Sequence, residues 1–186
     1  MSNFFMDMET LGIKENSVIL SIAVLSVPDD YRFNGDLNNV RSFGNVFYPN
    51  LKEQRSLGRK VDKETVEWWS KQSNEAKKVF SNKNMMSCSD IYKTIKNFFD
   101  KNNFTENDII WSRGLFEQKL WADFCDTLQV NNFIPYYSWR DTRTVCDIFT
   151  GNSKANLDNY EGLVVHNALD DCILDYIRLE NILLSR

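Results

Sequence analysis

The sequence predicts an α/β fold in which helices pack on both faces of a mixed β-sheet. Three observations lead to this prediction: three apolar, strand-like segments come first, turn-rich links separate them, and helical segments then alternate with short apolar ones. Because the links favour hairpins, we expect the first three strands to pair antiparallel. The 186 residues are enough for one domain with a substantial core, so we expect a single domain, residues 1–186.

The first three strands are predicted from runs of apolar residues at 4–8, 18–27 and 42–48. The links between them are rich in Asp, Asn, Gly and Pro, which favour turns and therefore indicate hairpins. Residues 52–61 are polar and basic, which predicts a loop.

In the rest of the chain, apolar residues recur mostly at helical spacing. They predict helices from about residue 62 and at 89–101, 115–128, 142–149 and 168–184, with short strands at 108–112 and 133–139. Trp68 and Trp69 are adjacent in the first of these helices. Since neighbouring residues on a helix do not share a face, at most one of them is expected in the core.

Composition argues against several classes of protein. No apolar run reaches the roughly 20 residues of a membrane helix, and the N-terminus lacks signal-peptide features, so we expect a cytoplasmic protein with no membrane association. The net charge of −4 argues against binding nucleic acid by bulk charge. Residues 52–83 nevertheless carry nine Lys and Arg against five Asp and Glu, either as a solvated face or as a phosphate-facing rim. The four cysteines lack zinc-site spacing and are expected to be buried thiols in a reducing compartment.

Two carboxylates, Asp7 and Glu9, are separated by one residue in the first predicted strand. On a strand, residues i and i+2 leave the same face, roughly 6–7 Å apart. Carboxylates this close repel each other, and both lose hydration if the strand is central. A lysine or arginine partner would explain such a pair in isolation, and a divalent cation is the other explanation.

Two later segments add polar side chains of the same kind. Glu117 begins a helix just after a short predicted strand, and His166, the only histidine, is expected at a strand-to-helix junction. Asp170 and Asp171 follow in the first turn of the last helix. Acidic residues at a helix N-terminus can simply be caps. Helix periodicity allows either Asp170 or Asp171 to join the other carboxylates.

Together these residues resemble the DEDDh family of 3′–5′ exonucleases, the DnaQ-like branch of the RNase H-like superfamily. The resemblance rests on three motifs: Asp7-Met8-Glu9, Phe116-Glu117, and His166 followed by Asp171. The tyrosine branch would have Tyr where this chain has Asn167. The segments METLG, TVEWWSKQSNEA, WSRG, WRDTRT and GLVVHNALDDC are similar to the subfamily of phage exonuclease A (DexA) and mycobacterial exoribonucleases, and they span essentially the whole chain.

The resemblance implies an RNase H-like sheet and an enzyme that releases nucleoside 5′-monophosphates from the 3′ end of DNA or RNA. It implies two Mg²⁺ (or Mn²⁺) ions, with Asp7 touching both, Glu9 and Asp171 completing the first site and Glu117 holding the second. His166 would remove a proton from the attacking water. The family usually has Asp at the position of Glu117, and this departure puts the second metal site in doubt.

The resemblance also implies contacts with a single-stranded or 3′-overhanging nucleic acid. The backbone at Met8 and Thr10 is expected to meet the terminal nucleotide, and Leu11 and Phe116 to pack against its base. For Trp69, core packing and stacking on a base are both open.

The segment WRDTRT contains Arg140, Asp141 and Arg143. For these residues we favour an internal Arg–Asp network over phosphate binding.

Two other functions remain open at this point. One is a catalytically weakened nucleic-acid-binding or interaction module of the same fold, which the departure at Glu117 would support. The other is an enzyme that acts on capped RNA ends. The Asn- and Lys-rich composition and the subfamily suggest a phage, and hence the host cytoplasm. A homo-oligomer is compatible with the sequence.

Overall fold

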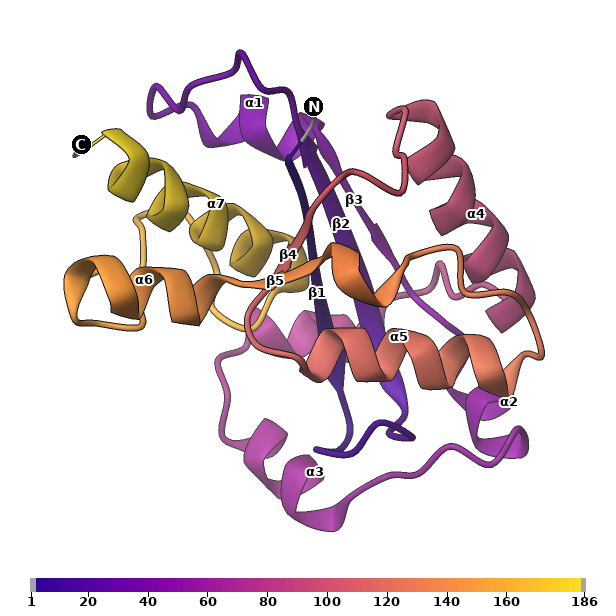
Figure 1. Cartoon of the computed structure of the whole chain (residues 1–186). Coiled ribbons are helices and arrows are strands. Elements are labelled where there is room, and N and C mark those ends of the chain that lie inside the picture. The colour runs from indigo at the N-terminus through magenta and orange to yellow at the C-terminus, as the bar shows by residue number, and fades with distance from the viewer. Residues whose placement is uncertain (1–2, 185–186) are drawn as a thin grey trace.

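A five-stranded mixed β-sheet forms the centre of the protein (Figure 1), seen in a computed structural model that describes residues 3–184. The strand order is β3-β2-β1-β4-β5. The strands are β1 (Asn3–Thr10), β2 (Ile19–Val27), β3 (Gly44–Phe47), β4 (Ile110–Ser112) and β5 (Trp139–Asp141). β1 to β3 pair antiparallel, while β4 and β5 join parallel. This confirms the predicted mixed sheet with three antiparallel strands first.

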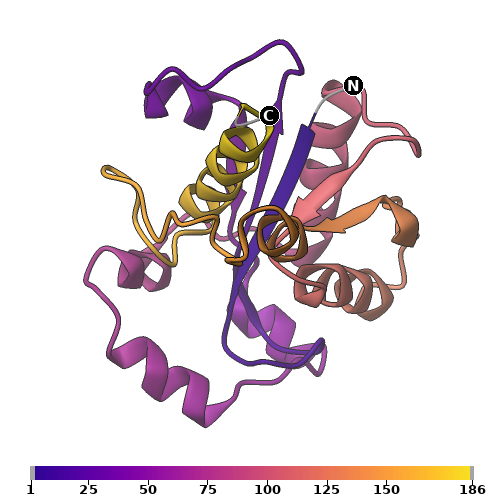
Figure 2. The ribbon, with the colours of Figure 1, turned by 60° about the vertical axis from the view of Figure 1, so that its left-hand side comes forward.

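Helices cover both faces of the sheet, as predicted (Figure 2). On one face lie α4 (Cys88–Lys101) and α5 (Phe116–Thr127). On the other lie α1 (Leu37–Ser42), α6 (Thr142–Thr150) and α7 (Ala168–Leu184).

The alternating side chains of β1 belong to both layers. Phe4, Met6 and Met8 pack in the cluster with α4 and α5, whereas Phe5 packs in the cluster with α7. Because side chains alternate along a strand, Asp7 and Glu9 point to the α7 side. The central strand therefore carries the paired carboxylates toward the last helix.

A smaller helical region lies beside the end of β1 (Figure 1). It contains α2 (Leu51–Ser56), α3 (Lys63–Ser70) and a 3₁₀ helix, η1 (Ala76–Ser81). Trp69 of α3 is buried in a cluster with Leu20 and Ala76, and this cluster attaches the region to the sheet.

Three local expectations are wrong. The link before β3 contains α1, because the side chain of Asp36 accepts hydrogen bonds from two backbone N–H groups of the first turn. The expected basic loop at 52–61 begins inside α2, which the Asn50 side chain caps in the same way. Residues 133–139 form a turn and a 3₁₀ helix, η2 (Tyr136–Ser138), and only Trp139 enters a strand. In the first two cases a side-chain cap starts a short helix, and in the third a 3₁₀ helix takes the place of most of the expected strand.

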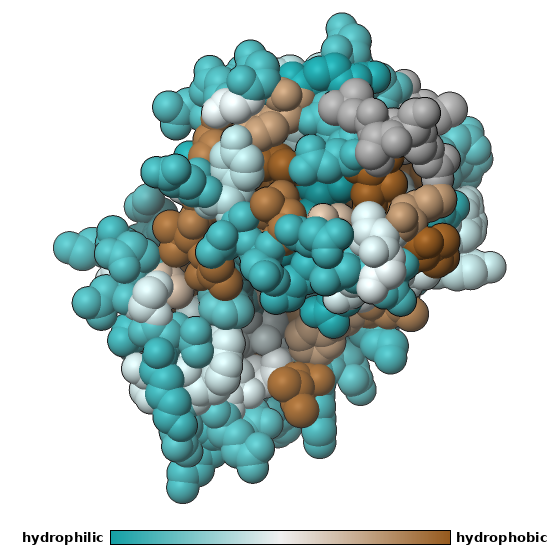
Figure 3. Space-filling view, turned by 90° about the vertical axis from the view of Figure 1, so that its left-hand side faces the viewer, coloured by the Kyte–Doolittle hydropathy of each residue, from teal (hydrophilic) through white to brown (hydrophobic). Residues whose placement is uncertain are grey.

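The surface has no broad hydrophobic belt on the face made by α6 and α7, where brown side chains form patches separated by hydrophilic ones (Figure 3). Between residues 3 and 184, no helix has the length and apolarity to cross a membrane. All four cysteines are buried and unpaired, as predicted.

Candidate active site

Four of the five carboxylates that line one cavity of about 400 Å³ are grouped there with the lone histidine, and the fifth, Asp158, pairs with Lys154. The four and the histidine come from three parts of the chain: the carboxyl-terminal half of β1, the first turn of α5, and α7 with the loop before it. The residues are Asp7, Glu9, Glu117, His166 and Asp171. These are the five residues named as catalytic from the sequence.

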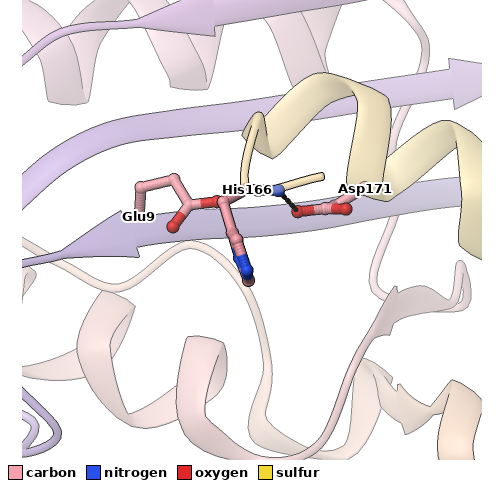
Figure 4. A group of neighbouring side chains, drawn as sticks. All are labelled: Glu9, His166 and Asp171. Carbon is pink, nitrogen blue, oxygen red and sulfur yellow. Dashed lines mark hydrogen bonds between the residues drawn. The ribbon is translucent and has the colours of Figure 1, made fainter. Parts of the chain in front are cut away.

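Glu9, His166 and Asp171 form the tightest group in the cavity (Figure 4). One potential ligand atom from each residue lies within 4.8 Å of the other two. In Figure 4 the two carboxylates point toward each other with His166 between them. The backbone N–H of His166 donates to Asp171 Oδ2 at 3.1 Å, which leaves the other oxygen of that carboxylate available.

The loop that presents His166 has no strand in it, so the expected strand-to-helix junction is wrong. His166 instead has a left-handed backbone with φ of 63°. Asp170 holds this loop, because its Oδ2 accepts the Val164 N–H at 2.9 Å and its Oδ1 pairs with Arg41. Of the two acidic residues that helix periodicity allowed, Asp171 faces the cavity and Asp170 anchors the loop.

Two tryptophans lie next to His166. The Trp68 ring meets the imidazole edge-on, with ring centroids 4.7 Å apart, and 41% of Trp68 is exposed. Trp69 is 2% exposed, and its indole N–H donates to the Thr10 carbonyl at 2.8 Å. As expected, only one of the pair is in the core. Burial of the His166 ring lowers its pKa, which favours the neutral imidazole.

Glu117 is 6% exposed, and its Oε2 has no hydrogen-bond partner among the described residues. A buried, unpaired carboxylate oxygen is costly, so such an atom calls for a partner from outside the chain. A divalent cation is the partner that suits a hard oxygen donor.

The pKa values of all four carboxyls are raised, mainly because burial disfavours the charged form. The pKa of Glu9 rises to about 8, with further contributions from Asp171 and Glu117. The pKa values of Glu117 and Asp171 each rise to about 7, and that of Asp7 lies well above its usual value. Bound protons relieve the repulsion between these buried carboxylates. Mg²⁺ or Mn²⁺ would relieve the same repulsion. The residues present therefore fit a divalent metal centre.

Comparison with known proteins identifies the family. Residues 2–183 match the model of the Rv2179c-like 3′-5′ exoribonuclease domain. The chain belongs to this family. It is also 26% identical to the exodeoxyribonuclease of Enterobacteria phage T4 over 209 residues, covering 97% of this chain and 88% of that protein.

Two solved structures share the fold. The nuclease domain of 3′hExo, a DEDDh family member bound to rAMP, has a TM-score of 0.68 at 12% identity and covers 99% of this chain and 92% of that one. Exonuclease X in complex with 5′ overhanging duplex DNA has a TM-score of 0.54 at 16% identity, covering 98% and 91%. The chain is thus a 3′–5′ exonuclease that acts on nucleic acid, as predicted, and it shares the fold of the DEDDh nucleases.

Four of the five residues expected to contact substrate line two adjoining cavities, and Leu11 lines neither. Thr10, Phe116 and Trp69 line a cavity of about 490 Å³ that shares Glu9 with the carboxylate cavity. Met8 lines the carboxylate cavity, and Leu11 packs against the buried cluster of Trp69. Exposed Trp68 also lines the larger cavity, so it offers more ring surface there than Trp69.

The expected network of Arg140, Asp141 and Arg143 does not form. Asp141 caps α6 by accepting the Arg143 backbone N–H at 3.0 Å, and Arg140 donates to carbonyls of its own turn. The buried Arg–Asp network of this family member is made instead by Arg113, Asp175 and Arg178. The sequence-based expectations did not include this network. Its one local signal is that Asp175 follows Asp171 by a single helical turn.

Neither predicted role, a solvated face or a phosphate-facing rim, describes every residue of the basic segment at 52–83. Arg59 is buried and pairs with Asp123, so it has a structural role. Lys78 lines a third cavity, of about 280 Å³, that shares His166 with the active site.

Proposed function

We propose that this exonuclease cleaves single-stranded or 3′-overhanging nucleic acid at a two-metal centre and releases nucleoside 5′-monophosphates. One observation carries the proposal: four carboxylates with raised pKa values share one cavity with the only histidine, and a buried Glu117 oxygen there lacks a partner. Among residues 3–184, the cavity supplies carboxylate oxygens that can bind a cation, and no Lys or Arg side chain bonds to that Glu117 oxygen.

Asp7, Glu9, Glu117 and Asp171 would hold Mg²⁺ or Mn²⁺, with Asp7 at the middle of the set. When bound, such ions lower the pKa of a water and stabilise charge on the phosphate oxygens. Glu117 replaces the Asp of the family motif, and its orphan oxygen supports a role for it at the metal centre.

His166 is proposed to accept the proton of the attacking water. Its pKa is lowered by burial, so the imidazole is neutral and able to accept a proton at neutral pH. Asp171 fixes the His166 backbone, and Trp68 packs against the ring. These two contacts limit how far the imidazole can move.

The terminal nucleotide is proposed to occupy the cavity of about 490 Å³ beside Glu9. The backbone at Met8 and Thr10 would meet the nucleotide, with Phe116 and Trp68 beside the base. Trp69 then acts indirectly, because its indole N–H holds the Thr10 carbonyl. Leu11 would approach the base from the edge of its buried cluster.

We also propose that residues 1–186 form a single exonuclease domain, because both main hydrophobic clusters pack on the same sheet. Four buried free thiols support a reducing compartment, the cytoplasm. Similarity to the phage T4 protein supports a phage origin and the host cytoplasm.

The test uses matched DNA and RNA oligonucleotides with a 5′ label and a free 3′ end. We expect Mg²⁺-dependent shortening one nucleotide at a time, with nucleoside 5′-monophosphates as the product and none in EDTA. Comparing the two rates decides between DNA and RNA. A capped RNA with a blocked 3′ end forms the third arm. Binding of the oligonucleotides without shortening of either would instead support the weakened binding module.

A further inference from the structure

Four cationic side chains line the wall of the carboxylate cavity: Arg113, Arg143, Lys154 and Arg178. Three of them already have carboxylate partners. Arg113 and Arg178 bind Asp175 at 2.8 and 2.7 Å, and Lys154 binds Asp158 at 2.8 Å. The guanidinium of Arg143 has no hydrogen-bond or ion-pair partner among residues 3–184.

Arg143 occupies a defined position in this wall. It lies in the first turn of α6, which Asp141 caps, and its side chain is exposed to solvent. Its charge lowers the pKa of Glu117, so the guanidinium lies within electrostatic reach of that carboxylate without bonding to it. The cation is therefore close to the metal-binding side chains and free to bind something else.

The substrate needs such a cation. A nucleic acid strand is a polyanion, the chain carries a net charge of −4, and five carboxylates line the cavity that must receive a phosphate. A guanidinium offers a planar pair of N–H donors that matches two phosphate oxygens, and it stays charged at every working pH.

We propose that Arg143 binds a phosphate of the substrate strand at the mouth of the active site. The inference rests on the proposed exonuclease function and adds a substrate-binding residue to it. It reverses the sequence-based preference for an internal network, because Asp141 uses its side chain to cap α6.

The first experiment measures initial rates on a single-stranded oligonucleotide at fixed Mg²⁺ and increasing NaCl. Arg143→Gln should raise KM about tenfold or more, with a much smaller change in kcat, since a phosphate contact is made in the ground state. It should also reduce the slope of log(kcat/KM) against log[NaCl] by about 0.7, the contribution of one phosphate on a single strand. Arg143→Lys should retain part of the affinity.

Arg140→Gln is the matched control. Arg140 is three residues away, donates only to carbonyls of its own turn, and does not line the cavity. Arg140→Gln should therefore have the KM and the salt slope of the wild-type enzyme. Equal effects of the two glutamine variants would overturn the proposal, because they would reflect general surface charge.

A Mg²⁺ titration separates phosphate binding from a positioning role toward Glu117. If Arg143 binds phosphate, the Mg²⁺ midpoint of Arg143→Gln at saturating substrate should match that of wild type. A shifted midpoint with unchanged KM and salt slope would contradict the proposal and make Arg143 a positioning residue. An inactive wild-type enzyme would refute the proposed function, whereas an active wild type with an unaffected Arg143→Gln would refute this inference alone.

Discussion

Asp171 and Asp175 are one turn apart on α7, yet their surroundings are opposite. Asp175 accepts hydrogen bonds from Arg113 at 2.8 Å, Arg178 at 2.7 Å and Thr142 Oγ1 at 2.7 Å. Asp171 accepts one backbone N–H, from His166, and otherwise faces Glu9 and the remaining carboxylates. The pKa of Asp171 rises to about 7, first because of burial and then because of Asp175 itself.

The difference separates a buried carboxylate with a structural role, which is neutralised by ion pairs, from one in the active site, which is not. Asp175 is 4% exposed and has two arginines, so its charge is balanced within the chain. At the active site, the carboxylates form no ion pair among the described residues, and Arg143 and Arg178 act on Glu117 and Asp171 only through their charge. Buried carboxylates that lack partners destabilise the metal-free protein, and we infer that cations from solution reverse this cost.

The largest expected effect is that of Asp7→Asn. The exchange removes a charge from the centre of the carboxylate set at almost constant shape, so hydrolysis should fall below detection. In EDTA the variant should unfold at a higher temperature than wild type, because Glu9, Asp171 and Glu117 lose a repulsive neighbour. Initial rates at saturating Mg²⁺ and thermal unfolding in EDTA are the two measurements. Full activity would exclude Asp7 from the metal centre.

His166→Ala should lower kcat by about 10²–10⁴-fold, the usual contribution of a general base. Divalent metal should still stabilise the variant against heat, because His166 is not a proposed ligand. A variant that lost this metal-induced stabilisation would place His166 among the ligands, which its position within 4.8 Å of Glu9 and Asp171 permits geometrically.

The two aspartates of α7 give a direct test of the comparison between them. Asp175→Asn should destabilise the protein by about 3–5 kcal/mol, because Arg113 and Arg178 would be left with an uncompensated buried charge. Asp171→Asn in EDTA should be neutral or stabilising, since it removes a charge that forms no ion pair among residues 3–184 and lies beside other carboxylates. Urea unfolding of both variants in EDTA measures the change in the free energy of unfolding. Equal destabilisation would mean that the two environments are equivalent.

Local sequence was sufficient for the parts of the site that lie within one element. The strand pattern placed Asp7 and Glu9 on one face, and the last helix was predicted at its observed bounds, 168–184. The spacing of the third motif, taken from the resemblance, selected Asp171, whereas periodicity left Asp170 open.

What the sequence did not provide depends on contacts between distant segments. The Trp68–His166 contact joins α3 to the loop before α7, and the Arg113–Asp175 pair joins the end of β4 to α7. The left-handed backbone at His166 lies in a loop that is held to α7 by hydrogen bonds to Asp170 and Asp171. No periodicity in a single segment encodes such pairings.

Metal-free protein should lose stability as the pH rises from about 4 to about 8. The folded-state pKa values of Glu9, Glu117 and Asp171 lie above their usual values, at about 8, 7 and 7. The folded state therefore binds more protons than the unfolded state in this window, and its stability falls as those protons are lost. Thermal unfolding in EDTA should show a decrease of several degrees over the window. Mg²⁺ or Mn²⁺ should flatten the profile, and an equally steep profile with saturating metal would contradict a metal centre at these residues.

The smallest effect is expected for Glu117→Asp, which shortens the side chain by one methylene and restores the residue usual in the family. The Glu117 carboxylate is 6% exposed and has an orphan oxygen, so a change of about 1 Å in its reach alters how closely it approaches a cation. The Mg²⁺ midpoint should shift a few-fold in either direction, depending on whether the backbone of α5 is adapted to Glu. Mn²⁺ should reduce the difference, because it binds such ligands more tightly. Glu117→Gln removes the charge and should raise the midpoint much further. Three superimposable metal titrations for wild type, Glu117→Asp and Glu117→Gln would show that Glu117 lies outside the metal centre, and its unpaired oxygen would then need another partner.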